Sequence, residues 1–160
     1  MPTIELITEI NSTLAICFDL SRSIDLHKIS TAGTNEQAIA GKTSGLITLK
    51  ESVTWQATHF GIRQKLCSHI TAYTRPYYFV DEQIKGAFKS IRHEHFFEQV
   101  AGKVIMKDRF AFETPLGPLG KLFNRLVLTR YMERFLINRN AVIKDFAESA
   151  KWQTVLNLAP

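Results

Sequence analysis

Residues 89–113 read KSIRHEHFFEQVAGKVIMKDRFAFE, and this stretch alternates apolar and polar side chains on both sides of an Ala-Gly pair. A period of two predicts two strands, about Lys89 to Glu98 and Lys103 to Glu113, with a turn at Ala101 and Gly102. A parallel pair would need a crossover of about a dozen residues, so these two strands must run antiparallel.

Similar patterns lie on the N-terminal side of this hairpin. Strands are predicted at Pro2–Ile10, at Val53–His59 and its continuation beyond the Phe60-Gly61 turn, and at Tyr77–Ile84. Between the first two of these strands, the residues up to about Lys28 have the apolar spacing and the serine caps of two short helices. The region therefore predicts an antiparallel meander.

A long helical pattern follows the strands. No Pro or Gly occurs between Lys121 and Ser149, and apolar residues recur at helical spacing, which predicts one helix over about 119–148. In the first half of this helix, apolar residues lie on nearly every face. That half must therefore be covered on several sides or contact something other than the sheet. Trp152, Val155, Leu156 and Leu158 form an apolar tail for which the pattern predicts no position.

The resulting fold class is α+β: a curved antiparallel sheet wrapped around a long C-terminal helix, with two short helices after the first strand. We expect residues 1–149 to form one domain and residues 150–160 a C-terminal tail.

Composition narrows the classes of function. The chain has 160 residues, 45% of them hydrophobic, and a net charge of +5, which suits a single globular domain. No apolar run suits a transmembrane helix and no secretion signal is visible, so we expect a cytoplasmic protein without stable membrane insertion. Basic residues are scattered, which argues against nucleic acid as a partner. Cys17 and Cys67 lack the companions that a disulfide framework or a zinc site requires, and we expect no cofactor.

Four motifs resemble those of the SRPBCC (START-like) superfamily: FDLSRSIDLH at 18–27, VTW at 53–55, SIRHEH at 90–95 and TPLGPLG at 114–120. The resemblance runs from about residue 3 to residue 148 and is greatest to small bacterial proteins described as polyketide cyclase/dehydrase-like or cell-division-protein-like. One departure is Lys50-Glu51, where the family tends to have a Gly and an acid. The resemblance implies a helix-grip fold whose deep cavity binds hydrophobic or amphipathic small molecules, and a minority of members catalyse reactions on them.

Alternation assigns side chains to the inner face of the sheet. His93 and His95 share one face of their strand, and Asp108 shares a face with Phe110 and Phe112. A four-residue turn would place His93 opposite Asp108, whereas a two-residue turn would place His95 there; both leave the faces unchanged. The remaining strands are expected to add Trp55, His59, Phe79 and Asp81.

Three interpretations of this histidine–aspartate cluster stay open. It could be a satisfied buried network, a polar anchor for a ligand, or a general acid/base pair. A metal site built on His93 and His95 lacks a third ligand at a convincing spacing.

The leading hypothesis is therefore a binding module for a lipid-like or polycyclic molecule, of unknown oligomeric state. One alternative is a cyclase or dehydratase that uses the His–Asp pair, and another is a protein-interaction module with a vestigial cavity and a docking tail at Trp152. The predicted ligand-binding residues are Trp55, His59, Phe79, Asp81, His93, His95, Asp108, Phe110, Phe112, Leu119, Phe123, Leu126 and Met132.

Overall fold

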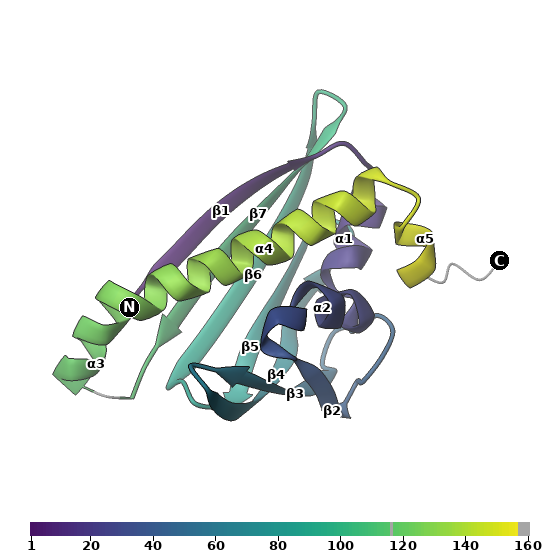
Figure 1. Cartoon of the computed structure of the whole chain (residues 1–160). Helices are drawn as coiled ribbons and strands as arrows, with labels where there is room; N and C mark the ends of the chain where they lie inside the picture. The colour runs from purple at the N-terminus through teal and green to yellow at the C-terminus, as the bar shows by residue number, and fades with distance from the viewer. Residues whose placement is uncertain (116, 157–160) are drawn as a thin grey trace.

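The computed structural model describes residues 1–115 and 117–156, without the side chains of residues 124 and 125. Seven antiparallel strands form one sheet in the order β1-β7-β6-β5-β4-β3-β2, and a long helix crosses its concave side (Figure 1). The strands are β1 (Thr3–Ile10), β2 (Gln37–Gly41), β3 (Ser52–His59), β4 (Ile62–Thr74), β5 (Tyr78–Lys85), β6 (Ser90–Val100) and β7 (Lys103–Glu113). The helices are α1 (Leu14–Ser21), α2 (Ile24–Ser30), the 3₁₀ turn η1 (Ala32–Thr34), α3 (Gly117–Phe123), the π-helical η2 (Asn124–Leu128), α4 (Thr129–Glu148) and α5 (Trp152–Val155).

The predicted fold class is confirmed, and two tight turns explain why the meander forms. Phe60-Gly61 joins β3 to β4 and Ala101-Gly102 joins β6 to β7, and all four residues have positive φ angles between 52° and 80°. Two successive left-handed residues match the right-handed twist of the flanking strands. The resulting two-residue turn places His95 directly opposite Asp108.

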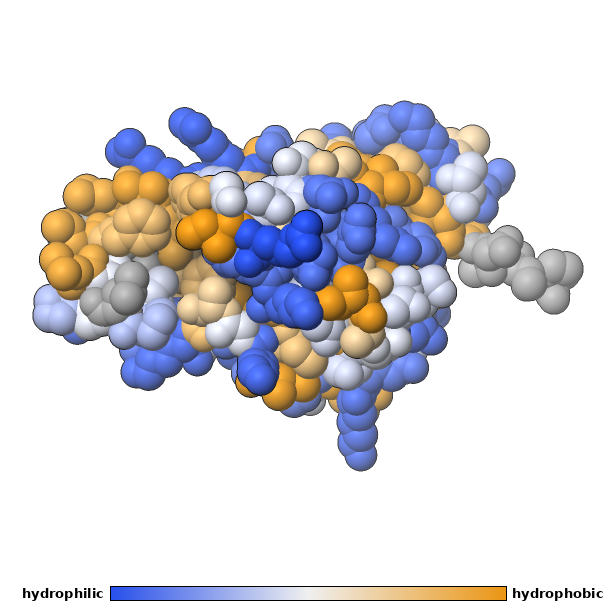
Figure 2. Space-filling model, turned by 60° about the horizontal axis from the view of Figure 1, so that its bottom comes forward, coloured by the Kyte–Doolittle hydropathy of each residue, from blue (hydrophilic) through white to orange (hydrophobic). Residues whose placement is uncertain are grey.

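The long C-terminal helical region departs from the predicted single α-helix. It begins at Gly117, and residues 124–128 are π-helical before α4 starts. Leu119 and Leu126, which we expected on a cavity wall, are 80% and 58% exposed. The reason is length: α3 lies beyond the strands at one end of the molecule (Figure 1), where Figure 2 shows apolar surface.

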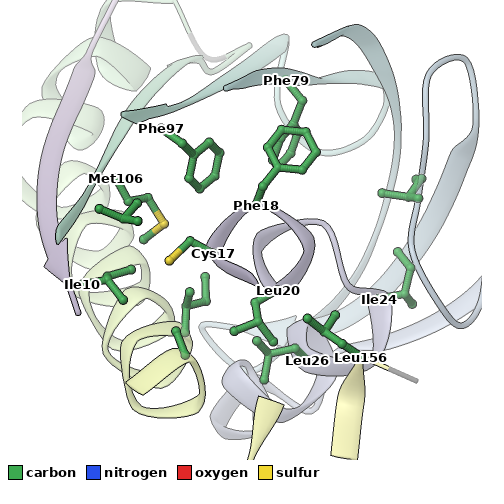
Figure 3. Packing of buried hydrophobic residues seen from close by; sticks show 14 of the residues in the cluster. Ile10, Cys17, Phe18, Leu20, Ile24, Leu26, Phe79, Phe97, Met106 and Leu156 are labelled. Carbon is green, nitrogen blue, oxygen red and sulfur yellow. The ribbon is translucent and has the colours of Figure 1, made fainter. Parts of the chain in front are cut away.

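The main core lies at the other end, between α1, the sheet and the end of α4. Phe18 packs edge-on against Phe79 and Phe97, with ring centroids 5.3 and 5.4 Å apart (Figure 3). Leu156 is 3% exposed in the same cluster, and the side chain of Trp152 packs against it. Residues 150–156 of the expected tail therefore cover the core, whereas residues 157–160, with Leu158, lie outside the described residues.

Among the described residues, no helix is long and apolar enough to cross a bilayer. Cys17, which is buried, and Cys67, which is half-buried, are free thiols.

Candidate functional site

A cavity of about 540 Å³ lies between the concave face of the sheet and the η2–α4 helix. Its size falls within the range of small-molecule sites. Most of its walls are apolar, because β3 to β7 turn alternate side chains inward. They include Trp55, Leu66, Ile91, Phe110, Leu128, Met132, Phe135 and Leu136.

Beneath the cavity, Asp108 is the centre of a buried polar network. One carboxylate oxygen, Oδ1, lies 2.8 Å from His93 Nε2 and 3.0 Å from His95 Nδ1. The other, Oδ2, accepts a hydrogen bond of 2.7 Å from the Asn140 side chain. The Arg139 guanidinium lies 3.7 Å from Oδ1 and donates to the carbonyl of Ser21 at 3.0 Å. Asp108 on β7 thus contacts both the histidines of β6 and the polar side chains of α4.

The charge states in this network follow from burial and contacts. Burial alone would raise the pKa of Asp108, but the contacts with His93 and His95 outweigh it and hold that pKa well below its usual range. Burial, followed by repulsion from His93, lowers the pKa of His95 to about 3. At neutral pH the centre is therefore a carboxylate beside a neutral His95 and the Arg139 guanidinium.

His93, His95 and Asp108 also bring three candidate metal ligands within 4.8 Å of one another. However, Arg139 lies within 3.7 Å of Asp108, and Asn140 already bonds the second carboxylate oxygen. A cation placed between these ligands would be repelled by the guanidinium. The arrangement suits a hydrogen-bond network better than a metal centre.

Asp81 is one of three cavity-lining residues, with Gln83 and Thr114, that have a buried side-chain oxygen without a hydrogen-bonding partner in the described part of the chain. It lies on β5 directly opposite His93 on β6, and in the described part of the chain no hydrogen-bonding atom reaches its buried Oδ1. Burial raises the pKa of Asp81, against smaller opposing effects from Ser68, His93, His27 and Arg139. Asp81 is half-buried as a residue, but its Oδ1 atom is buried; burial of a carboxyl favours its neutral form, which can both donate and accept a hydrogen bond.

Further polar side chains line the cavity, contributed by α2, β3, α4 and the chain before β2. His27 Nε2 lies 3.1 Å from the Glu36 carboxylate, and the His27 ring packs on Trp55 with centroids 4.3 Å apart. His59 Nδ1 lies 2.6 Å from the hydroxyl of Tyr131. Each of these polar side chains has a hydrogen-bonding partner, in contrast to Oδ1 of Asp81.

The structure separates the predicted site residues into three groups. Trp55, His59, Asp81, His93, Phe110, Phe123 and Met132 line the cavity. His95 and Asp108 lie beneath it, and Phe79 and Phe112 are packed in the core, with Phe79 stacked on His95 at 4.1 Å. Leu119 and Leu126 lie on the outer surface, so the inward position expected for these two was wrong. Phe79 and Phe112 point inward as expected, but they pack in the core and do not line the cavity.

Several polar residues of the site were not predicted: His27, Glu36, Tyr131, Arg139 and Asn140. A signal existed for the last two, because positions 139 and 140 continue the stripe of Met132, Leu136 and Ile143 along α4. Polar residues on an apolar helical stripe indicate a buried partner. His27 and Glu36 carried no comparable signal, since only the tertiary fold brings α2 and the chain before β2 to the cavity.

Replacing Asp81 with asparagine is expected to stabilise the protein, and the gain should grow with pH. Because the folded-state pKa of Asp81 is raised, its favourable contribution is full below the unfolded value and is lost as pH rises through the folded value. Asparagine has no such cost, so the gain in the free energy of unfolding at pH 8 should be on the order of 1 kcal/mol. Urea unfolding at pH 4.5 and pH 8 measures the difference.

Glu82, the next residue on β5, is a control of opposite sign. The pKa of Glu82 is lowered, first by Thr71 and then, against burial, by Arg92. The wild type therefore gains stability from this carboxylate as pH rises through the acidic range, and Glu82→Gln should fall further below wild type over that range. Equal behaviour of the two variants would contradict the raised pKa of Asp81.

Comparison with known proteins found similarity of fold and not of sequence. No protein-family model matches the chain, and no curated protein matches it. The di-domain ARO/CYC StfQ from the steffimycin biosynthetic pathway superposes with a TM-score of 0.74 at 13% identity, covering 91% of this chain and 50% of that one. Major latex-like protein 151 from Panax ginseng gives 0.65 at 17% identity (92% and 99% covered), and Ara h 8.0201 gives 0.59 at 14% (89% and 97% covered). This likeness is one of fold, and the chain therefore has a helix-grip fold, with an antiparallel sheet around a long C-terminal helix.

Proposed function

We propose that the chain binds an apolar small molecule, lipid-like or polycyclic, in the cavity between the sheet and the η2–α4 helix. The observation that carries this proposal is the cavity of about 540 Å³ with apolar walls. A vestigial cavity would be filled by side chains, since protein interiors are packed to the density of organic crystals. The cavity of this chain is instead left open between apolar walls.

We infer that Asp81 fixes the orientation of the ligand, which apolar walls alone cannot do. A few polar groups in an otherwise apolar pocket fix the position of a ligand, and the unpartnered Oδ1 of Asp81 calls for a hydrogen bond from or to the guest. We therefore infer a ligand with a hydroxyl or carbonyl group on one side of a largely apolar skeleton. The His93–Asp108 network serves as the support beneath it.

The proposal is tested with the neutral dye N-phenyl-1-naphthylamine, an aromatic probe with one N–H donor. We expect a saturable rise in dye fluorescence with one dye bound per native chain, and its loss on unfolding. Signal that does not saturate, or a stoichiometry well above one, would count against a single internal site.

A second candidate function is a cyclase-type reaction, and it rests on the pairing of Asp81 with His93. The two residues face each other across neighbouring strands and both line the cavity, so an acid with a raised pKa lies beside an imidazole within reach of a ligand. The fold shared with the ARO/CYC StfQ makes such chemistry reasonable but does not assign it. In an enzyme, Asp81→Asn would abolish turnover and keep binding, whereas in a binding protein it would change affinity alone.

A further inference from the structure

The cavity opens at one end of the molecule, and three chain segments surround the opening. The exposed residues among its lining are Phe60 and Ile62 at the β3–β4 turn, Ala87 at the β5–β6 turn, and Pro115 and Phe123 at the start of the helical region. All other lining residues are buried or half-buried. These five residues therefore mark the mouth.

Apolar surface continues from the mouth onto the outer side of the helix. Leu119, Leu122 and Leu126 are 80%, 56% and 58% exposed. The Phe60 ring joins the turn to the helix, with its centroid 6.1 Å from that of Phe123 and 4.6 Å from that of Tyr131. Figure 2 shows apolar residues gathered at this end. We call the surface formed by Phe60, Ile62, Leu119, Leu122, Phe123 and Leu126 the rim patch.

The charges around the rim patch have one sign. Residues 59–65, 84–89 and 115–130 contain no Asp or Glu. The basic residues in these segments whose side chains the structure describes are Arg63, Lys65, Lys85, Lys89, Lys121 and Arg130. Glu113, at the end of β7, is paired with Lys89 at 2.8 Å. An apolar surface surrounded by cations is complementary to a bilayer that contains anionic lipids, where apolar side chains enter the interface and Lys and Arg meet the headgroups.

A second copy of the chain fits this surface less well. In a two-fold symmetric dimer the same patch would face itself, which would bring two sets of basic residues together around an apolar contact. A bilayer accepts the apolar residues and also neutralises the cations.

We propose that the rim patch docks reversibly on an anionic membrane surface and places the mouth of the cavity at the boundary between headgroups and acyl chains. The ligand then passes between membrane and cavity without crossing water; this transfer step rests on the proposed binding function, whereas the docking does not. The helical segment lies in the interface and does not span the bilayer.

The docking is tested by co-sedimentation with vesicles of phosphatidylcholine containing 30% phosphatidylglycerol, and with vesicles of phosphatidylcholine alone. We expect the chain to bind the anionic vesicles more tightly, and the binding to weaken in high salt. The variant Leu122→Gln/Leu126→Gln should reduce the partition coefficient by about tenfold or more, because two aliphatic side chains no longer enter the interface. The matched control is Ile7→Gln/Ile137→Gln, which removes two side chains that are 71% and 48% exposed outside the rim patch and should leave the partition coefficient unchanged.

Two outcomes overturn the docking: no binding of the wild type to anionic vesicles, or equal loss in both double variants. A concentration-dependent dimer that Leu122→Gln/Leu126→Gln disperses, in the absence of vesicle binding, assigns the patch to a second copy instead. Dye titration without vesicles separates this inference from the proposed function. If the dye binds saturably and the vesicles do not bind, only the docking proposal is contradicted. If the vesicles bind and the dye does not, only the proposed binding function is contradicted.

Discussion

Replacing Asp108 with alanine is expected to lower the free energy of unfolding by about 3–5 kcal/mol, the usual cost of removing one partner from a buried ionic network. The side chain is fully buried, and its two oxygens contact His93, His95 and Asn140, with the Arg139 guanidinium 3.7 Å away. Alanine would leave a buried guanidinium and two imidazoles without their common partner. Urea unfolding followed by tryptophan fluorescence measures the loss.

Two further variants make the result specific. Asp108→Asn keeps the shape and one oxygen, so it should cost less than alanine. Because the pKa of Asp108 is lowered in the folded protein, the stability from its charge is present above the unfolded value and is lost as pH falls through the folded value; the difference between Asn and wild type should shrink toward acid pH. Lys107→Ala, on the exposed face of the same strand, should change stability by less than about 0.5 kcal/mol. A loss in Asp108→Ala no larger than that of Lys107→Ala would contradict the network.

The same variant separates structure from binding. Asp108 lies beneath the cavity and not on its wall, so Asp108→Asn should keep dye affinity near that of wild type. A large fall in affinity without a change in stability would instead make Asp108 part of the ligand contact.

Met132→Trp is expected to weaken the binding of N-phenyl-1-naphthylamine by about tenfold or more. Met132 is 9% exposed and lines the cavity from α4, so a larger ring at this position occupies space that the ligand needs. Fluorescence titration gives the dissociation constant of each protein.

The matched control is Ile137→Trp, which adds an indole at an exposed position of the same helix. It should leave the dissociation constant unchanged. Equal affinity of wild type and Met132→Trp would place the dye outside the cavity.

The sheet and its polar floor could be predicted because their determinants are local. Alternation along β6 and β7 assigns His93, His95 and Asp108 to one face whichever turn joins the strands, since each register differs by an even number of residues. The sequence alone left open which histidine lies opposite Asp108; the positive φ angles at Ala101 and Gly102 resolve it, and His93 also reaches the carboxylate from the neighbouring position along the strand.

The helical side of the site could not be predicted in the same way. A helix apolar all round does not reveal which face meets the sheet, and the π-helical turn at 124–128 changes the direction of every side chain after it. Leu119 and Leu126 were therefore assigned inward, although α3 lies past the end of the sheet. Glu36 and His27 come together only through the tertiary fold, and no sequence spacing predicts such a pair.

The central claim, that the cavity holds a ligand against α4, is tested most directly by NMR of protein labelled with ¹³C at its methionine methyl groups. The chain has three methionines: Met132 lines the cavity, Met106 is fully buried in the core beside Ser21, and Met1 is exposed. On titration with N-phenyl-1-naphthylamine, we predict that the Met132 methyl signal shifts and saturates at one equivalent, while the Met106 and Met1 signals stay nearly in place. A Met132 signal that does not move while the dye binds would contradict the account.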